Sequence, residues 1–385
     1  MSTSISEQTA GGLRWLVVTG QRLSAFRALG EVARDEIRDV LDGMPERAAL
    51  QAFLSTARGG AAFERVVSAT SAAHPVELAE LEALAEGAGV DFEAMLLANL
   101  RGDLGGDDGT GCSDVGWRRG RSVIAHNEDG APAVQGRFML VTLALDSAAP
   151  VTTQWYAGFL PSNTFIVSGH GLAWGINHLQ ANVPAAASGR HFVARGLQQA
   201  RSLDEAIDYL VTHPSAGGFT YNFGEVATGR VATVESAAGR TAVIEADPAA
   251  RPFLWHTNHL RYLCGEEPGS PASRGDADAA PGVVDEATRS LGQADESRAR
   301  GCVLEALDFS EEEPSPQSFL DVLTSPAPRG VYRSAGHGDP LMTLCSTAVD
   351  LTSGEVTLQP RDRTAVRLRL TDLASGRANA PSTPM

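Results

Sequence analysis

The pattern of apolar residues changes sharply at a stretch rich in glycine and aspartate, residues 102–111. Before it, after one strand-like run at residues 13–19, apolar residues recur mostly at the three- and four-residue spacing of amphipathic helices. After it come many short runs rich in β-branched and aromatic residues, interrupted by pairs of helical segments. The chain is therefore expected to be an α+β protein in which helices cover sheets, with a mostly helical N-terminal segment.

The expected elements fall on both sides of this stretch. Helices are predicted over residues 24–41, 47–54, 75–86 and 92–100, and later over 190–199, 203–210, 285–306 and 316–323. Strands are predicted over residues 122–126, 138–145, 151–156, 164–167, 172–176, 219–223, 231–235, 241–245, 253–256, 341–349, 355–358 and 365–370. Residues 102–111 and 265–282 have the composition of exposed loops, the first of them mobile.

Composition and charge exclude several functions. With 43% hydrophobic and 20% charged residues, the chain is typical of a packed globular protein. Its net charge of −16 disfavours binding to nucleic acid or to anionic membranes. The first residues lack the pattern of a signal peptide, and no run of about 18 apolar residues occurs, so we expect a cytoplasmic protein. The four widely spaced cysteines are expected to be free thiols.

One of these cysteines begins the strand-rich part of the chain, in the sequence Gly111-Cys112-Ser113. The Cys112 thiol could attack the Gly111 carbonyl, which no Cβ shields, and convert the peptide bond into a thioester that water then cleaves. The new α-amine of Cys112, with a reference pKa of about 7.7–8.0, could serve as the base for its own thiol. The Gly-Cys dipeptide alone is equally compatible with an idle cysteine.

Further motifs surround Cys112 in a fixed order. They are residues 75–93 in the helical segment, Asn127-Glu128-Asp129, residues 171–177, Arg195 with residues 202–207, residues 221–235 and Thr257-Asn258-His259. Their order and spacing resemble the isopenicillin N acyltransferase-like (acyl-coenzyme A:6-aminopenicillanic acid acyltransferase) family of autoproteolytic N-terminal nucleophile (Ntn) cysteine hydrolases. This resemblance spans most of the chain.

The resemblance implies a fold and a set of site residues. The fold would be a four-layer αββα sandwich, with residues 1–111 as a light chain that stays bound after self-cleavage and residues 112–385 as the catalytic portion. Asp129 would orient the new amine, and the Asn258 amide would donate to the oxyanion of the tetrahedral intermediate. Arg333 is the nearest candidate for an arginine that the family places by its site, although residues 336–340 depart from the family pattern.

The implied reaction passes through an acyl-cysteine thioester. A small amide or an acyl thioester, including a coenzyme A thioester, would acylate Cys112. Water as the acceptor gives a hydrolase, and an amine gives an acyltransferase. No metal or other cofactor is implied, and the expected partners are the small-molecule substrate and the enzyme's own N-terminal fragment.

Three alternatives compete with this interpretation. A thiol hydrolase that never cleaves itself would need an external base such as His256. A non-catalytic protein of the same fold would bind ligands without using Cys112. His256 and His259 could also bind a metal, although the residues before them favour a strand. Apart from these alternatives, four aromatic residues could line an acyl pocket, although aromatic side chains more often pack in a core. They are Trp155, Tyr156, Phe159 and Phe165.

Overall fold

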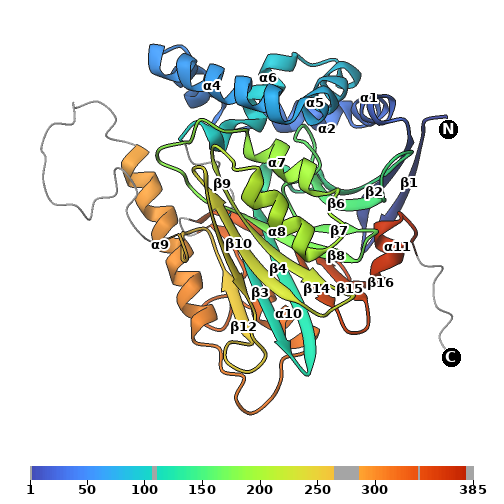
Figure 1. Ribbon diagram of the computed structural model, residues 1–385, viewed down its shortest axis with the longest axis vertical. Coiled ribbons are helices and arrows are strands. Elements are labelled where there is room, and N and C mark those ends of the chain that lie inside the picture. The colour runs from blue at the N-terminus through green and yellow to red at the C-terminus, as the bar shows by residue number, and fades with distance from the viewer. Residues whose placement is uncertain (1, 106–110, 264–285, 337–338, 379–385) are drawn as a thin grey trace, which may run out of the picture.

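The computed structural model describes residues 2–105, 111–263, 286–336 and 339–378. Two sheets face one another, and helices cover the outer face of each (Figure 1). This arrangement confirms the predicted four-layer αββα sandwich. Of the two expected loops, all of residues 265–282 and the middle of residues 102–111, namely 106–110, lie outside the described residues. The expectation of an exposed loop is wrong at both described ends of residues 102–111, because residues 102–104 are buried and Gly111 begins a buried strand.

The larger sheet has nine strands. In spatial order they are β1 (Ser4–Ala10), β2 (Leu13–Gly20), β5 (Phe138–Leu145), β6 (Val151–Tyr156), β7 (Ile166–Ser168), β8 (Leu172–His178), β9 (Gly218–Glu225), β10 (Val231–Ala237) and β11 (Arg240–Glu245). Helices α7 (Arg190–Leu197) and α8 (Leu203–Thr212) belong to its outer layer, where α8 contacts β9, β10 and β11.

The smaller sheet contains the strand that begins at Gly111. Its spatial order is β12 (Phe253–His256), β3 (Gly111–Arg119), β4 (Arg121–Gly130), β14 (Asp339–Asp350), β15 (Glu355–Pro360) and β16 (Val366–Arg369), with β13 (Ser334–Gly336) paired to β14. Helix α9 (Glu286–Glu305) packs on β12 and β3, and α10 (Pro316–Thr324) packs on β4 and β14. A short helix, α11 (Leu370–Ala374), ends the described chain.

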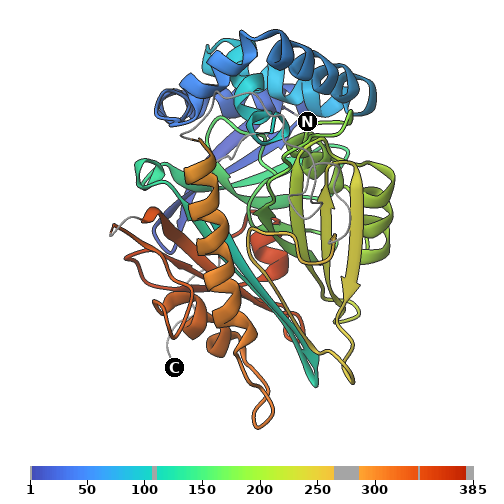
Figure 2. The same cartoon turned by 90° about the vertical axis from the view of Figure 1, so that its left-hand side faces the viewer.

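The N-terminal segment forms a helical cap at one end of the sandwich (Figure 2). Its helices are α1 (Arg22–Val32), α2 (Arg34–Asp42), α3 (Arg47–Leu54), α4 (Ala57–Ala73), α5 (Pro75–Ala88) and α6 (Phe92–Asn99). The helix predicted over residues 24–41 is two helices, because Ala33 leaves the helical conformation with φ −103 and ψ 22. The segment also contributes β1, which the sequence pattern missed, and β2, which pairs in parallel with β5.

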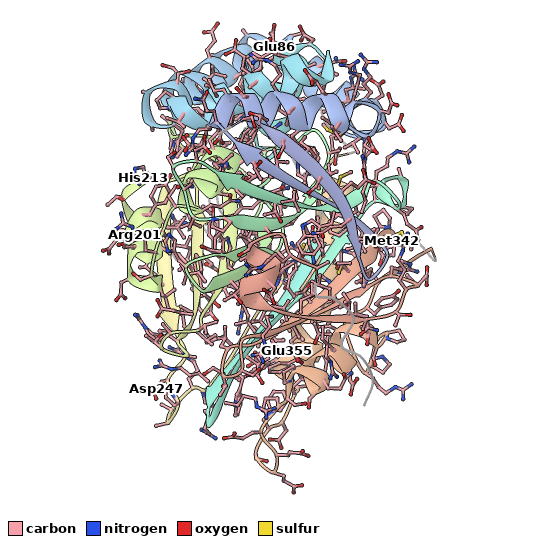
Figure 3. The ribbon with its side chains drawn as sticks, turned by 90° about the vertical axis from the view of Figure 1, so that its right-hand side faces the viewer. Glu86, Arg201, His213, Asp247, Met342 and Glu355 are labelled. Atoms are coloured by element: carbon pink, nitrogen blue, oxygen red, sulfur yellow. The ribbon has the colours of Figure 1, made fainter. Side chains whose placement is uncertain are left out.

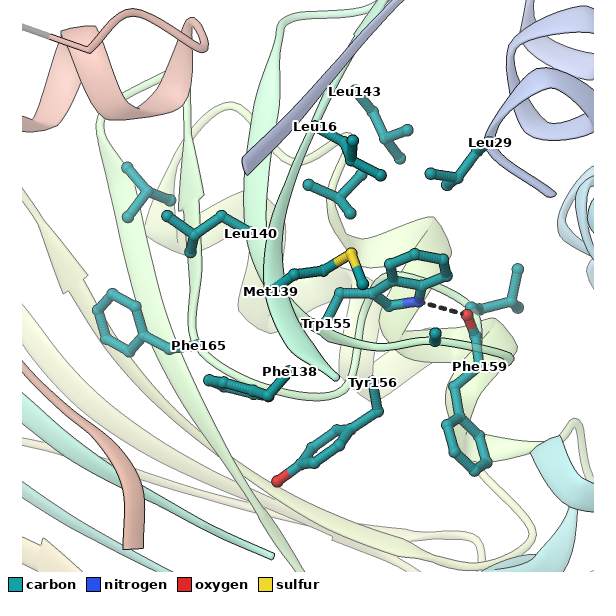
Figure 4. Close-up of a cluster of buried hydrophobic side chains, with 14 of the residues drawn as sticks. Leu16, Leu29, Phe138, Met139, Leu140, Leu143, Trp155, Tyr156, Phe159 and Phe165 are labelled. Carbon is teal, nitrogen blue, oxygen red and sulfur yellow. Dashed lines mark hydrogen bonds between the residues drawn. The ribbon is translucent and has the colours of Figure 1, made fainter. Parts of the chain in front are cut away.

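The main hydrophobic core joins the cap to the larger sheet (Figure 4). Leu16 of β2 and Leu29 of α1 pack in the same buried cluster as Leu140 of β5 and Trp155 of β6. The Trp155 indole donates a hydrogen bond to the Phe159 carbonyl at 2.8 Å, which satisfies its one polar atom. Phe159 and Phe165 belong to this core as well, so packing, and not an acyl pocket, explains them.

A buried ion pair also ties the cap to the rest of the fold. The carboxylate of Glu80 in α5 accepts two hydrogen bonds from the Arg195 guanidinium in α7, at 2.7 and 2.9 Å. Both side chains are almost fully excluded from solvent, whereas Arg22, which also pairs with Glu80, is one quarter exposed.

Exposed charges such as Glu86 and Asp247 lie at opposite ends of the molecule (Figure 3). No helix in the described part of the chain is long and apolar enough to cross a membrane.

Candidate active site

The site is organised by the antiparallel hairpin of β3 and β4. In its register Gly111 lies opposite Asp129, and Cys112 lies opposite Glu128. Because neighbouring residues of a strand face opposite sides of a sheet, Cys112 and Glu128 share one face, and Gly111 and Asp129 share the other. The Cys112 thiol donates to Glu128 Oε1 at 3.8 Å and is buried. The two sides of the Gly111–Cys112 peptide thus meet two different carboxylates.

Asn258 contacts the backbone of Cys112. It follows β12, which pairs with β3 and thereby brings the residue to the start of that strand. Asn258 Oδ1 accepts a hydrogen bond from the Cys112 amide nitrogen at 3.0 Å, while Asn258 Nδ2 donates to the His178 carbonyl at 3.2 Å. The amide oxygen, and not the amide nitrogen, therefore faces Cys112. The donor function expected of Asn258 remains a prediction.

Arg300 of α9 completes this side of the site, and sequence reasoning missed it. Its Nη1 donates to the Cys112 carbonyl at 2.5 Å, and its Nη2 donates to Asn258 Oδ1 at 2.7 Å. Glu296, one helical turn earlier, accepts from Arg300 Nε at 2.7 Å and holds the guanidinium in place. Since a guanidinium only donates, its contact fixes which end of the Asn258 amide faces Cys112.

Asp129 lies beside Gly111 and is fully buried. Its Oδ1 accepts from the Thr343 hydroxyl at 2.7 Å, while Oδ2 has no hydrogen-bond partner among the described residues. Burial raises the pKa of Asp129 to about 7, although the nearby Arg333 and Arg300 oppose the shift. Asp129 therefore has one carboxylate oxygen available for a new donor.

Arg333 also reaches the site. It is buried, its Nη2 pairs with Asp339 at 2.5 Å, and its Nη1 lies 3.3 Å from Glu296. A Cβ added to Gly111 would collide with the Arg333 guanidinium, so only glycine allows this approach. The structure thus brings together all four residues expected in the site, Cys112, Asp129, Asn258 and Arg333.

On the thiol side, a second buried cluster lies between the sheets. His126 Nδ1 is 3.1 Å from Asp114 Oδ1, and His126 Nε2 is 3.0 Å from Glu128 Oε2. The Tyr156 hydroxyl donates to Glu128 Oε1 at 2.8 Å. A Cβ on Gly175 of β8 would overlap Asp114 and His126, so this glycine makes room for the cluster between the two sheets.

Burial and charge shift the titration of this cluster. Burial alone would lower the pKa of His126, but Asp114 and Glu128 outweigh it and raise the pKa well above its usual range. Burial, followed by the charge of Glu128, raises the pKa of the Cys112 thiol to about 12. These effects favour the neutral form of the Cys112 thiol in this structure.

His256, the base considered from the sequence, is engaged elsewhere. Its Nε2 lies 2.8 Å from Glu235 Oε1, and its Nδ1 lies 2.6 Å from the Thr257 carbonyl. The histidine close to the thiol is His126, which sequence reasoning did not select. The arrangement therefore gives no support to a Cys112–His256 dyad, because His256 is hydrogen-bonded to Glu235 and to the Thr257 carbonyl.

Among the described residues, His256 and His259 do not belong to any group of three or more ligand side chains that could hold a metal ion. His259 Nδ1 lies near the hydroxyls of Thr257 and Ser297, not beside His256 in a shared coordination site. Within the described ranges, one group has three metal-ligand types close enough for an ion, namely Cys112, His126 and Glu128. Both nitrogens of His126 are already hydrogen-bonded to carboxylates there.

A cavity of about 480 Å³ adjoins the Asp129 side of the site. Thr343, the hydroxyl donor to Asp129, lines it together with Tyr332 and Arg361. The cavity is large enough for a small polar molecule.

Comparisons with known proteins agree with the resemblance noted in the sequence. The model of the family described as acyl-coenzyme A:6-aminopenicillanic acid acyl-transferase matches residues 117–330, more than half of the chain. The beta-alanyl-dopamine/carcinine hydrolase of Drosophila melanogaster is 25% identical over 174 residues, which cover 40% of this chain and 45% of that protein. The match thus spans less than half of the relative's length.

Two solved structures are also similar to this chain. A mutant of the conjugated bile acid hydrolase of Clostridium perfringens has a TM-score of 0.46 at 10% identity, covering 69% of this chain and 95% of that one. The penicillin V acylase of Agrobacterium tumefaciens has a TM-score of 0.39 at 13% identity, covering 68% and 88%. Because the family model matches more than half of the chain, this chain belongs to the acyl-coenzyme A:6-aminopenicillanic acid acyl-transferase family.

Proposed function

We propose that this protein is a self-processing Ntn enzyme that uses Cys112 to hydrolyse a small amide or to transfer an acyl group to an amine. The observation that carries the proposal is the enclosure of the Gly111–Cys112 peptide. Asn258 Oδ1 lies 3.0 Å from the Cys112 nitrogen, and the Arg333 guanidinium lies against Gly111. Asp129 lies opposite Gly111, and one of its oxygens has no hydrogen-bond partner in the part of the chain that the structure describes. These groups converge on the bond that self-cleavage would break and on the nitrogen that it would release.

Self-cleavage would change what this site offers. Before the cut, the Cys112 nitrogen belongs to a peptide and cannot accept a proton. After the cut it is an α-amine with a reference pKa near 8, which can take the proton of its own thiol at neutral pH. Asn258 Oδ1 and the free oxygen of Asp129 are acceptors suited to holding the resulting ammonium.

Residues 1–111 would then remain docked as a light chain. Strand β2 pairs with β5 across six residue pairs, and the Glu80–Arg195 ion pair joins α5 to α7. The shared hydrophobic core adds to these contacts. Separating the fragments would expose all of this surface to water, which is unfavourable.

Catalysis would proceed through an acyl-cysteine. The thiolate attacks the acyl carbonyl, and the leaving group takes the proton from the Cys112 amine. The donors to the oxyanion would include the second N–H of Asn258 Nδ2, the one that the His178 carbonyl does not use. One such oxyanion donor typically contributes about a hundredfold to a thousandfold in turnover. Water or an amine then attacks the thioester and restores the thiol. None of these steps requires a metal or a redox cofactor.

The substrate class follows from the family and the named relatives. The family description supports transfer between a coenzyme A thioester and an amine, and the Drosophila relative supports hydrolysis of a small amide. The two activities share the acyl-cysteine, and they differ in the acyl donor, a thioester or an amide, and in the acceptor that attacks the acyl-cysteine, an amine or water. The acceptor therefore decides whether the enzyme acts as a hydrolase or as a transferase.

Trapping the acyl-enzyme tests this function. The purified protein is incubated with acyl-coenzyme A thioesters and small N-acyl amines, quenched in acid and analysed by mass spectrometry and peptide mapping. We expect the acyl mass on Cys112 of the fragment 112–385, and its loss when a small amine is added. Cys302→Ala, at an exposed free cysteine, should acylate normally, whereas Cys112→Ala should not. Turnover that persists in Cys112→Ala would refute the proposal.

A further inference from the structure

The uncut chain poses a chemical problem that the finished enzyme does not have. The α-amine proposed as the base for Cys112 does not exist until the Gly111–Cys112 bond is broken. Something else must take the thiol proton for the first, self-directed attack. The thiol is buried, and the pKa of about 12 makes spontaneous ionisation rare at neutral pH.

In the described part of the chain, the carboxylate in contact with the thiol is that of Glu128. Glu128 Oε1 accepts from Cys112 Sγ at 3.8 Å, and the register of β3 and β4 holds the two residues directly opposite. The other oxygen, Oε2, lies 3.0 Å from His126 Nε2, whose far nitrogen is 3.1 Å from Asp114. His126 thus links two buried carboxylates in one row that ends at the thiol.

We propose that Glu128 is the base of self-cleavage, with His126 and Asp114 as positioning residues that hold its carboxylate against Cys112. The proposal deepens the self-processing function above and rests on it. Glu128 acts once, in the intact chain, and the Cys112 amine replaces it in the mature enzyme.

The proposed step balances as follows. The Cys112 S–H proton moves to Glu128 Oε1, and the sulfur attacks the Gly111 carbonyl carbon. The C–N bond of Gly111–Cys112 breaks, and the released nitrogen takes the proton from Glu128 to become an amine. Water then adds to the thioester carbonyl, the C–S bond breaks, and the sulfur regains a proton. The products are a Gly111 carboxylate and a free N-terminal Cys112.

Electrostatics gives Glu128 two opposite effects, and this makes the proposal testable. As a nearby negative charge it disfavours the Cys112 thiolate, so removing that charge should lower the pKa of the thiol. If charge were its only effect, Glu128→Gln would speed self-cleavage. If Glu128 is the base, the same variant slows it.

The ionisable groups that face Glu128 come from four strands. They are Cys112 and Asp114 of β3, His126 of β4, Tyr156 of β6 and Cys345 of β14. Of these, the Tyr156 hydroxyl donates directly to the oxygen that faces the thiol. Because this hydrogen bond stabilises the carboxylate, Tyr156→Phe should raise the pKa of Glu128 and move the rising limb of the cleavage rate to higher pH. A merely structural residue would leave that limb in place.

The experiment follows the conversion of the full chain to two fragments by intact mass after expression, at a series of pH values. We expect Glu128→Gln to slow conversion about a hundredfold or more, the magnitude of a lost general base, and Glu128→Asp to restore part of the rate. Thermal melting of each variant checks that it is folded.

The possible outcomes separate the two proposals. A wild-type chain that cuts while Glu128→Gln cuts as fast or faster overturns the role of Glu128 and leaves the proposed function intact. A wild-type chain that never cuts overturns both. An unmoved pH limb in a folded Tyr156→Phe variant also contradicts the role of Glu128.

Discussion

Removing one partner of the buried ion pair between Glu80 and Arg195 should strongly destabilise the contact between the cap and the body. In Glu80→Ala the Arg195 guanidinium, 1% exposed, would lose both of its hydrogen bonds to that carboxylate without access to water. Arg22, the other partner of Glu80, is 25% exposed and can turn toward solvent. Leaving one buried charge unpaired typically costs about 3–5 kcal/mol.

This cost is measurable by guanidinium unfolding and by thermal melting. We expect a loss of about 3–5 kcal/mol in the free energy of unfolding. The melting temperature should fall by about 4–6 °C, because the entropy of unfolding is about 2.1 cal/mol/K per residue. The matched control is the double variant Glu80→Leu, Arg195→Met, which replaces both charges with apolar groups and should recover most of the loss. A single variant that loses less than about 1 kcal/mol, or a double variant no better than the single, would refute the reasoning.

Three further variants test the site. Asp129→Asn should remove a pH-dependent loss of stability. A carboxyl whose pKa is raised to about 7 in the folded protein stabilises the fold at pH values below its unfolded pKa of about 4, and this contribution is lost as the pH rises through 7. Melting temperatures measured between about pH 4 and pH 7 should therefore fall more steeply with pH for wild type than for the variant. Gly111→Ala should slow self-cleavage at least tenfold, measured by intact mass, because the added Cβ displaces the Arg333 guanidinium. The control is Gly60→Ala, whose added Cβ meets only ordinary contacts and which should cut at the normal rate. Gly175→Ala should slow cleavage and lower the melting temperature, because it intrudes on Asp114; an unchanged rate and melting temperature would contradict the packing described for that cluster.

Most of the fold could be predicted from local patterns. Strands such as β5 and β14 and helices such as α5 follow from residue spacing, which depends on neighbours in sequence. The strand β1, Ser4–Ala10, was missed because it is polar and mostly exposed, so it lacks the alternation that marks a half-buried strand. It is held by pairing with β2, a tertiary effect that propensity does not encode.

The site could be predicted only where a motif carried it. Cys112, Asp129, Asn258 and Arg333 were selected through a family resemblance, and the structure places them together. Arg300 was not selected, because it lies in an ordinary helical pattern and its partner Cys112 is distant in sequence. One sequence feature could have pointed to Arg300: it follows Glu296 by four residues, the spacing at which a glutamate and an arginine form an ion pair on a helix.

The thiol cluster was missed for a related reason. His126 and Glu128 belong to the same short motif as Asp129, yet alternation along β4 directs them to the opposite face of the sheet. Sequence alone did not show that Asp114 and Gly175 would complete that face, because they come from other strands.

The N-terminal residue of the active protein tests the central claim most directly. Purified wild type should be separated under native conditions, and the fraction that forms the acyl-enzyme should be analysed by N-terminal sequencing and intact mass. The account predicts two co-purifying fragments, residues 1–111 and 112–385, the second beginning with a free Cys112. An active protein in which Cys112 is still joined to Gly111 would contradict it.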